Sequence, residues 1–161
     1  MVEIRPARPE DSEALCEIID EVDALHREHL PHIFQKPAGP VRERDYLLGL
    51  MADDEAGLFV AELEGRLVGF VDVIVRDTVP LPLLVPRRVA IVDNLAVQAG
   101  HRRSGIGQAL METAQEWAAA RGATSIELNV YAFNQAAIAF YQRLGYQTHS
   151  FRLRRPLPGP G

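Results

Sequence analysis

Apolar positions along the chain alternate between the spacing of strands and the spacing of helices. Residues 2–5 fit a short strand, and after Pro9 the apolar residues recur every three or four positions, as on one face of a helix. A proline and two acidic residues in the first turn mark the start of this helix. Its predicted apolar face consists of Ala14, Leu15, Ile18, Ile19, Val22 and Leu25.

The rest of the chain repeats this alternation. A helix over about 41–51 is predicted to carry Tyr46 on its apolar face. Glu64-Gly65-Arg66 fits a hairpin turn, and residues 78–86, with their three prolines, fit a loop. The remaining predictions are strands at 58–63, 67–75, 90–97, 125–131 and 146–153, and helices at 107–120 and between Asn134 and Gly145.

Composition fits one compact domain. The chain has 161 residues, which is near the commonest domain size, and 47% of them are hydrophobic. No apolar run approaches transmembrane length, and the first residues fit a strand and not a secretory signal. Cys16 is the only cysteine, which excludes an intrachain disulfide and favours a reducing compartment. We therefore expect one cytoplasmic domain over residues 1–155, no membrane partner, and a flexible tail at 156–161.

The segment that follows residue 97 carries the strongest chemical signal. Arg102 and Arg103 come after an apolar strand, and Gly105 and Gly107 open the next helix. Glycines let the backbone approach a ligand closely, while the free N–H groups and the dipole of a helix N-terminus attract anions. These features together predict a site for a multiply charged anion, most simply a pyrophosphate.

Three other interpretations of these glycines fit less well. A dinucleotide fingerprint requires the strand to run almost directly into the first glycine, but seven residues separate Val97 from Gly105. A nucleotide P-loop requires Gly-Lys-Ser/Thr, which the chain lacks. A purely structural glycine turn does not explain the adjoining arginines.

Arg102-x-x-Gly105-x-Gly107 resembles the acyl-CoA signature of the GNAT superfamily of N-acetyltransferases, in which this motif follows a strand ending in Leu-x-Val, here Leu95-Ala96-Val97. A second block, from Asn134 to Tyr146, resembles the Asn-x-x-Ala-x-x-Phe-Tyr-x-x-Leu-Gly-Phe helix of the same family. The resemblance is specific over roughly residues 89–146. It implies an α/β fold of GNAT type, with a mixed, centrally splayed sheet and helices on both faces.

The resemblance also implies acetyl-CoA as the cosubstrate, no metal, and transfer to a primary amine by direct attack in a ternary complex. The pantetheine arm would pair with main-chain groups of Leu95, Ala96 and Val97 and with the side chain of Asn134. The pyrophosphate would lie on Arg102, Arg103, Ser104, Gly105, Ile106, Gly107 and Gln108. There are two alternatives to acetyl transfer. The enzyme could transfer a larger acyl group, or the chain could be a CoA-binding or sensing module without turnover.

Tyr141 follows Phe140 as the general acid does in the family, where it would contact the thiol end of the cofactor. Its alternative role is core packing, because it shares a helical face with neighbouring apolar residues. The main-chain N–H of Leu95 is the expected donor to the attacked carbonyl.

The general base is less well defined. Asn129 stands where many relatives have a glutamate, and it cannot act as a base. Asp93 is the preferred candidate, because alternation places it on the strand face of Leu95, although it could equally anchor a bulge or loop. Asp72 is a third candidate, or else a solvent-facing residue on a half-buried strand.

The histidine-rich segment after residue 25 is the candidate acceptor region. His26, His29 and His32 are spaced by three residues, but Pro31 breaks the helix that would align them, so no metal site is expected. In the family this link covers the acceptor pocket, so His26, Glu28 and His29 are predicted to contact the amine, and either histidine could relay a proton. The net charge of −5 argues against nucleic acid and favours a cationic small-molecule, peptide or protein amine, with a homodimer as a possible assembly.

Overall fold

The computed structural model describes residues 1–38 and 43–160. The chain divides into two compact units, Met1–Asn129 and Val130–Gly161, and each is described by itself. The predicted first two residues of the second helix, 41 and 42, lie outside the described residues. In the described part of the chain, no helix is both long enough and apolar enough to span a bilayer.

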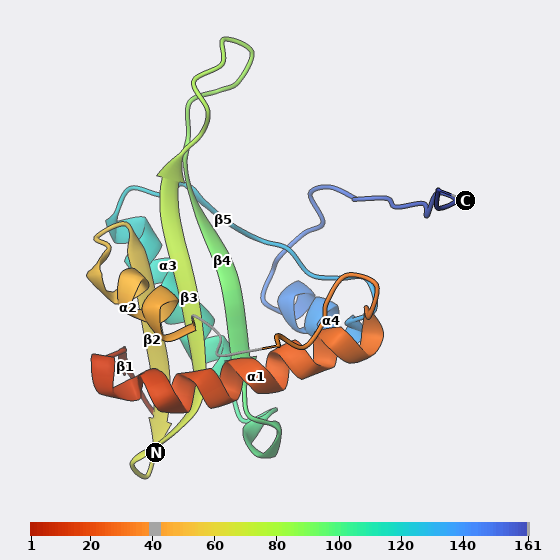
Figure 1. Ribbon diagram of the computed structural model, residues 1–161. Helices are drawn as coiled ribbons and strands as arrows, with labels where there is room; N and C mark the ends of the chain where they lie inside the picture. Colours follow the sequence, from red (N-terminus) through yellow and green to blue (C-terminus); the bar gives the residue numbers. More distant parts are fainter. Residues whose placement is uncertain (39–42, 161) are drawn as a thin grey trace. The chain divides into compact units, whose positions relative to one another are not determined.

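The first unit contains a five-stranded sheet in the order β1-β2-β3-β4-β5 (Figure 1). The first four strands pair antiparallel, whereas β4 and β5 pair parallel, which is the arrangement expected of two strands connected through a helix. The strands are β1 Glu3–Pro6, β2 Ala56–Leu63, β3 Arg66–Asp77, β4 Arg88–Val97 and β5 Ser125–Leu128.

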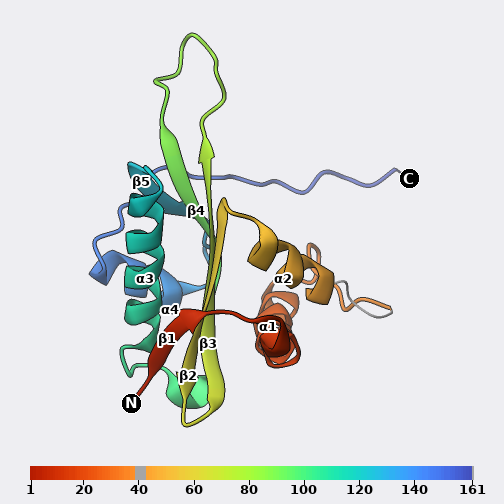
Figure 2. The same cartoon turned by 90° about the vertical axis from the view of Figure 1, so that its left-hand side faces the viewer.

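Helices cover both faces of this sheet, which confirms the mixed α/β arrangement. Figure 2 shows α1 (Ser12–His29) and α2 (Glu43–Ala52) on one face and α3 (Ile106–Ala120) on the other. The core beneath α1 and α2 is apolar because each element turns its hydrophobic stripe or face toward the others. Its buried members are Leu15, Ile18, Leu47, Leu58, Val60, Phe70 and Ala96.

The predicted hairpin between β2 and β3 is confirmed. Leu63 lies opposite Arg66, and the two turn residues, Glu64 and Gly65, have φ of 51° and 77°. Positive φ at both central residues is the geometry that matches the twist of two-residue hairpins. This hairpin sets the register of β3, the strand that supports the candidate site.

The second unit contains α4 (Gln135–Arg143). Asn134 caps this helix as predicted, since its side-chain oxygen accepts the N–H of Ala137 at 3.2 Å. Gly145, with φ of 94°, follows the helix.

Two strand predictions near the C-terminal end are wrong. The strand predicted over 146–153 is absent, and residues 146–160 form neither helix nor strand in the described chain, with Phe151 86% exposed. β5 ends at Leu128 and not at residue 131. Alternation of apolar and polar residues indicates a half-buried surface. A strand also needs a neighbouring strand for its backbone hydrogen bonds, and the sequence pattern does not show whether one is present.

Candidate functional site

The end of β4 extends beyond its pairing with β5. The parallel pairing ends where Val92 lies opposite Leu128, whereas β4 continues to Val97. Gln98 donates to the carbonyl of Val68 at 2.8 Å, so these two residues form a hydrogen-bonded pair. Bonded and non-bonded pairs alternate along an antiparallel ladder, so the pair Val71–Leu95, three positions further on, is a non-bonded pair. The N–H of Leu95 therefore points away from β3, toward the side on which the β5 pairing has ended.

The loop after β4 opens α3 with free N–H groups. Arg103 and Gly105 have φ of 62° and 85°, and Gly105 stands at the helix N-cap, where no side chain caps the helix. The first helical bond runs from Ala109 to Gly105 at 3.0 Å, so the preceding N–H groups of the first turn have no helical acceptor. The helix begins at Ile106, one residue before the predicted start. This terminus has the unpaired donors and positive dipole end that an anion needs.

Side chains of the loop complete this candidate anion site. Arg102 donates from Nε to the carbonyl of Val97 at 3.1 Å, which ties the loop to the end of β4. Its terminal nitrogen lies 3.9 Å from Glu21 of α1, and 57% of the Arg102 side chain is exposed, so this surface ion pair is weak. Ser104 donates to the carbonyl of His101. Arg103, Ser104, Gly105 and Gln108 are exposed, so the loop leaves both arginines accessible to a ligand.

Asp93 is the extra residue of a β-bulge. Asp72 lies opposite Asn94 and Val73 lies opposite Val92, so Asp93 has no direct partner on β3. The hydroxyl of Tyr46 on α2 donates to Oδ2 of Asp93 at 3.3 Å. Asp93 therefore lies at a bulge, and its role as the general base stays a prediction.

The predicted common face of Asp93 and Leu95 is wrong. Gly69 and Val71 lie on the same face of β3, and a Cβ added at Gly69 would meet Leu110 of α3. Leu95 lies opposite Val71, so its side chain is on the α3 face of the sheet. Asp93 instead contacts Tyr46 of α2, which packs on the opposite face. The bulge interrupts alternation, and this is why the expected face is reversed.

Asp72 is buried, so the alternative of a solvent-facing side chain is wrong. It is 2% exposed, and its two oxygens accept the main-chain N–H and side-chain amide of Asn94 at 2.8 and 2.9 Å. Burial raises the pKa of Asp72 to about 6, although the Asn94 hydrogen bonds oppose the shift.

The raised pKa of Asp72 predicts how the free energy of unfolding depends on pH. The unfolded chain ionises Asp72 near pH 3.8 and the folded chain near pH 6, so the folded state binds more protons between these values and Asp72 destabilises it as pH rises. Asp72→Asn removes the titration. Relative to the wild type, the variant should gain about 2 kcal/mol of unfolding free energy between pH 4 and 7, measured by urea denaturation. If the difference in unfolding free energy between Asp72→Asn and the wild type stays constant across this range, the pKa of Asp72 is not raised by folding.

The histidines bond within their own helix. Nδ1 of His26 and of His29 lie 2.9 and 3.0 Å from the carbonyls of Val22 and Leu25, and His26 also packs edge-on against Phe34. The helix ends at His29, as Pro31 predicted, while Glu28 is exposed. In the described ranges, no group of three His, Cys, Asp or Glu side chains is arranged to hold a metal ion.

Tyr141 belongs to the second unit, where it packs between aromatic neighbours. Its ring meets those of Phe140 and Tyr146 edge-on, with centroids 5.2 and 5.7 Å away. Burial and then the charge of Tyr146 raise the pKa of Tyr141 to about 12, so the phenol keeps its proton at neutral pH. Asn134 uses its side-chain oxygen for the helix cap, and its contact with the cofactor stays a prediction. The catalytic role of Tyr141 stays a prediction.

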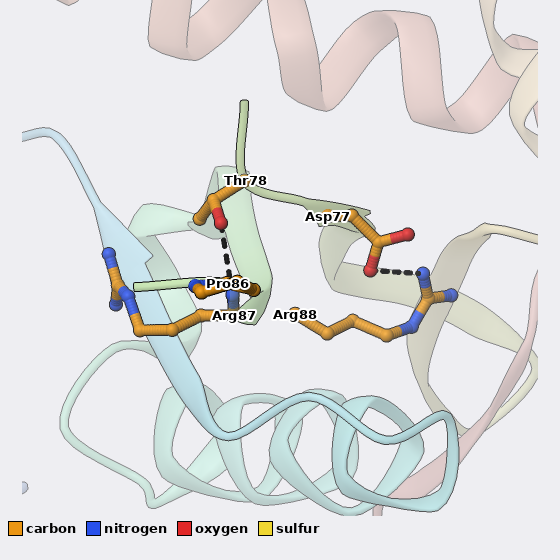
Figure 3. Close-up of a pocket in the computed structure, with 5 residues that line it drawn as sticks. All are labelled: Asp77, Thr78, Pro86, Arg87 and Arg88. Atoms are coloured by element: carbon orange, nitrogen blue, oxygen red, sulfur yellow. Dashed lines mark hydrogen bonds and ion pairs between the residues drawn. The ribbon is translucent and has the colours of Figure 1, made fainter. Parts of the chain in front are cut away.

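A pocket of about 260 Å³ lies at the opposite end of β4 (Figure 3). Thr78 accepts the N–H of Arg87 at 3.0 Å, and Arg88 forms ion pairs with Asp77 and Glu55. Arg88 begins β4 and Val97 ends it, so roughly 30 Å of strand separates this pocket from the glycine loop. Arg87 and Arg88 each have a carboxylate within ion-pair distance, and this pocket is not the predicted cofactor site.

Sequence reasoning missed two polar residues near the bulge. Tyr46 was assigned to an apolar helix face, but 47% of it is exposed and its hydroxyl reaches Asp93. Asn94 was not singled out, although it holds both oxygens of Asp72. The polar pair Asp93-Asn94 inside an apolar strand was the available signal, because such a pair interrupts strand alternation.

Comparisons with known proteins identify the family of the chain. The profile of the Acetyltransferase (GNAT) family matches residues 19–146. An uncharacterized N-acetyltransferase of Methanocaldococcus jannaschii is 40% identical over 104 residues, which are 65% of this chain and 45% of that protein. The chain thus spans about half the length of this relative.

Two solved structures show the same fold. A Bacillus halodurans protein has a TM-score of 0.91 at 24% identity, over 97% of this chain and 99% of that chain. An aminoglycoside N-acetyltransferase in complex with CoA has a TM-score of 0.72 at 15% identity, over 96% and 100%. With the profile match across most of its length, the chain belongs to the acetyltransferase (GNAT) family.

Proposed function

We propose that the chain transfers the acetyl group of acetyl-CoA to a primary amine. The observation that carries this proposal is the uncapped start of α3, in the connection that follows the part of β4 where β5 no longer pairs. A pyrophosphate on the first turn of α3 would lead the rest of the cofactor toward the main-chain groups of Leu95 and Val97. Family membership and a CoA complex on the same fold support this cofactor.

The reaction joins the amine nitrogen to the acetyl carbon and breaks the bond from that carbon to sulfur. The amine proton passes to Asp93, directly or through water, while the N–H of Leu95 stabilises the negative charge that develops on the carbonyl oxygen. Tyr141 donates its phenolic proton to the departing thiolate. Attack is direct, and the enzyme forms no covalent intermediate.

The acceptor is a cationic amine, either a small molecule or an amine of a peptide or protein. Asp93 is exposed beside Tyr46 and offers a carboxylate to an ammonium group. His26, Glu28 and His29 at the end of α1 are proposed to contact the same acceptor. The net charge of −5 favours its approach. We also propose a cytoplasmic location, because the chain has a single cysteine, and no nucleic-acid partner.

Thiol release tests the function. Purified protein is mixed with acetyl-CoA and a panel of polyamines, aminoglycosides, amino acids and peptides, and free CoA thiol is measured with a chromogenic disulfide. Amine-dependent release supports acetyl transfer. CoA binding without release for any amine would favour the non-catalytic binding module, and faster release from longer acyl-CoA would favour a larger donor.

Asp93→Asn tests the general base. The asparagine keeps the shape and the hydrogen bond from Tyr46 but cannot take a proton, so the rate should fall about a hundredfold or more. The matched variants are His26→Gln and His29→Gln. A wild-type rate in Asp93→Asn together with a hundredfold loss in one histidine variant would transfer the role to that histidine.

A further inference from the structure

Asp72 is a buried carboxylate without a cationic partner. It lies in the middle of β3 at 2% exposure, and in the described part of the chain it forms no ion pair. Asp11 is the contrasting case, because two nitrogens of Arg5 donate to its carboxylate at 2.8 and 3.0 Å and lower its pKa. An unpaired buried carboxylate is costly, so a specific role for Asp72 is expected.

The Asp72 carboxylate faces the bulge of β4. Oδ1 accepts the main-chain N–H of Asn94 at 2.8 Å and Oδ2 accepts its side-chain amide at 2.9 Å. Both donors belong to Asn94, which directly follows Asp93, the extra residue of the bulge. A bulge disrupts the local ladder, so its conformation depends on bonds of this kind.

We propose that Asp72 is a positioning residue that clamps the bulge and so fixes the directions of the Asp93 carboxylate and the Leu95 N–H. It is not the general base, since both of its oxygens are engaged by Asn94 and the side chain is buried. Asn94 connects the clamp to Leu95 through one peptide bond on one side and to Asp93 on the other. The consequence for turnover rests on the proposed function, whereas the clamp itself does not.

The clamp depends on the ionised form of Asp72. Protonation converts one of its oxygens into a hydroxyl and removes an acceptor from the two Asn94 donors. The titratable groups around it are Asp93 of β4 and Tyr46 of α2, whose pKa is raised by burial and then by the Asp72 charge. The other elements that pack on this face of the sheet, α1 and β2, contribute apolar residues to it, namely Leu15, Ile18 and Leu58.

Titration by NMR tests the clamp without substrate. In the ¹⁵N-labelled full chain, the main-chain and side-chain amide signals of Asn94 should shift with a midpoint near pH 6. Asp93→Asn should lower this midpoint, because the Asp93 charge opposes ionisation of Asp72. Asn94 signals that do not move between pH 4.5 and 7.5, or a midpoint that Asp93→Asn leaves unchanged, would overturn the proposal, and neither result requires Asp72→Asn to fold.

Kinetics test the positioning role. Asp72→Asn should lower kcat about 10- to 100-fold, the cost of a misplacement of about 1 Å, while the calorimetric Kd for CoA changes far less, because residues 102–108 are untouched. The control is Asp77→Asn at the end of the same strand, where kcat should not change. A wild-type kcat in folded Asp72→Asn would overturn the proposal. A wild-type protein that transfers no acetyl group refutes the proposed function, and the NMR titration then still decides the clamp.

Discussion

Gly105→Val is expected to weaken CoA binding more than a hundredfold. Gly105 has φ of 85°, a region in which a side chain costs about 1–2 kcal/mol. Apart from its own chain neighbours, no atom of the described residues lies within 4 Å of a Cβ built there, so valine meets no clash with them. The side chain would instead occupy the space over the first turn of α3, where the pyrophosphate is proposed to lie. The loss should appear in calorimetry with CoA.

Gly65→Val provides the matched control. Gly65 has φ of 77°, and its Cβ position is equally open, but it lies in the β2–β3 hairpin. Both variants therefore carry the same kind of backbone strain and should lose similar thermal stability. Only Gly105→Val should lose CoA. Wild-type affinity in folded Gly105→Val, or an equal loss in Gly65→Val, would show that the proposed phosphate site is wrong.

Local signals in the sequence predicted most of the first unit. Pro31 correctly marked the end of α1, and Glu64-Gly65 marked the hairpin, because both effects act within a few residues of the chain. The glycine loop was equally local, since strand, arginines, glycines and helix follow one another between residues 90 and 120. Its position after β4 could therefore be predicted without knowledge of tertiary contacts.

The bulge could not be predicted in the same way. Its geometry depends on hydrogen bonds between Asp72 and Asn94, which are 22 residues apart and meet only when β3 and β4 pair. Alternation counts residues along one strand and assumes that each has a partner. One extra residue shifts that count, which reversed the expected face of Asp93.

Tyr46 shows a related limit of hydrophobic patterns. Its ring fits an apolar helix face, but its hydroxyl donates to Asp93 across the gap between α2 and the sheet. An aromatic side chain with a polar tip can serve both environments, and the sequence does not show which one its hydroxyl reaches. The contact between Tyr46 and Asp93 could therefore be identified only from the structure.

Tyr141→Phe should lower kcat about a hundredfold or more while CoA affinity is preserved. The substitution removes only the phenolic oxygen, and general acid catalysis contributes an effect of this size. Because burial holds the Tyr141 pKa at about 12, the wild-type phenol is protonated across the assay range, and no basic limb from this group is expected below about pH 10. Steady-state kinetics with single-turnover controls separates the chemical step from product release.

Tyr146→Phe is the control for packing around this phenol. Its ring lies 5.7 Å from that of Tyr141 in the same unit, so it reports on the loss of a neighbouring hydroxyl without loss of the proposed proton donor. The Tyr146 variant should keep most of its turnover. If the two variants lose activity equally, or if Tyr141→Phe turns over at the wild-type rate with chemistry limiting, Tyr141 is a packing residue and the thiolate takes its proton from solvent.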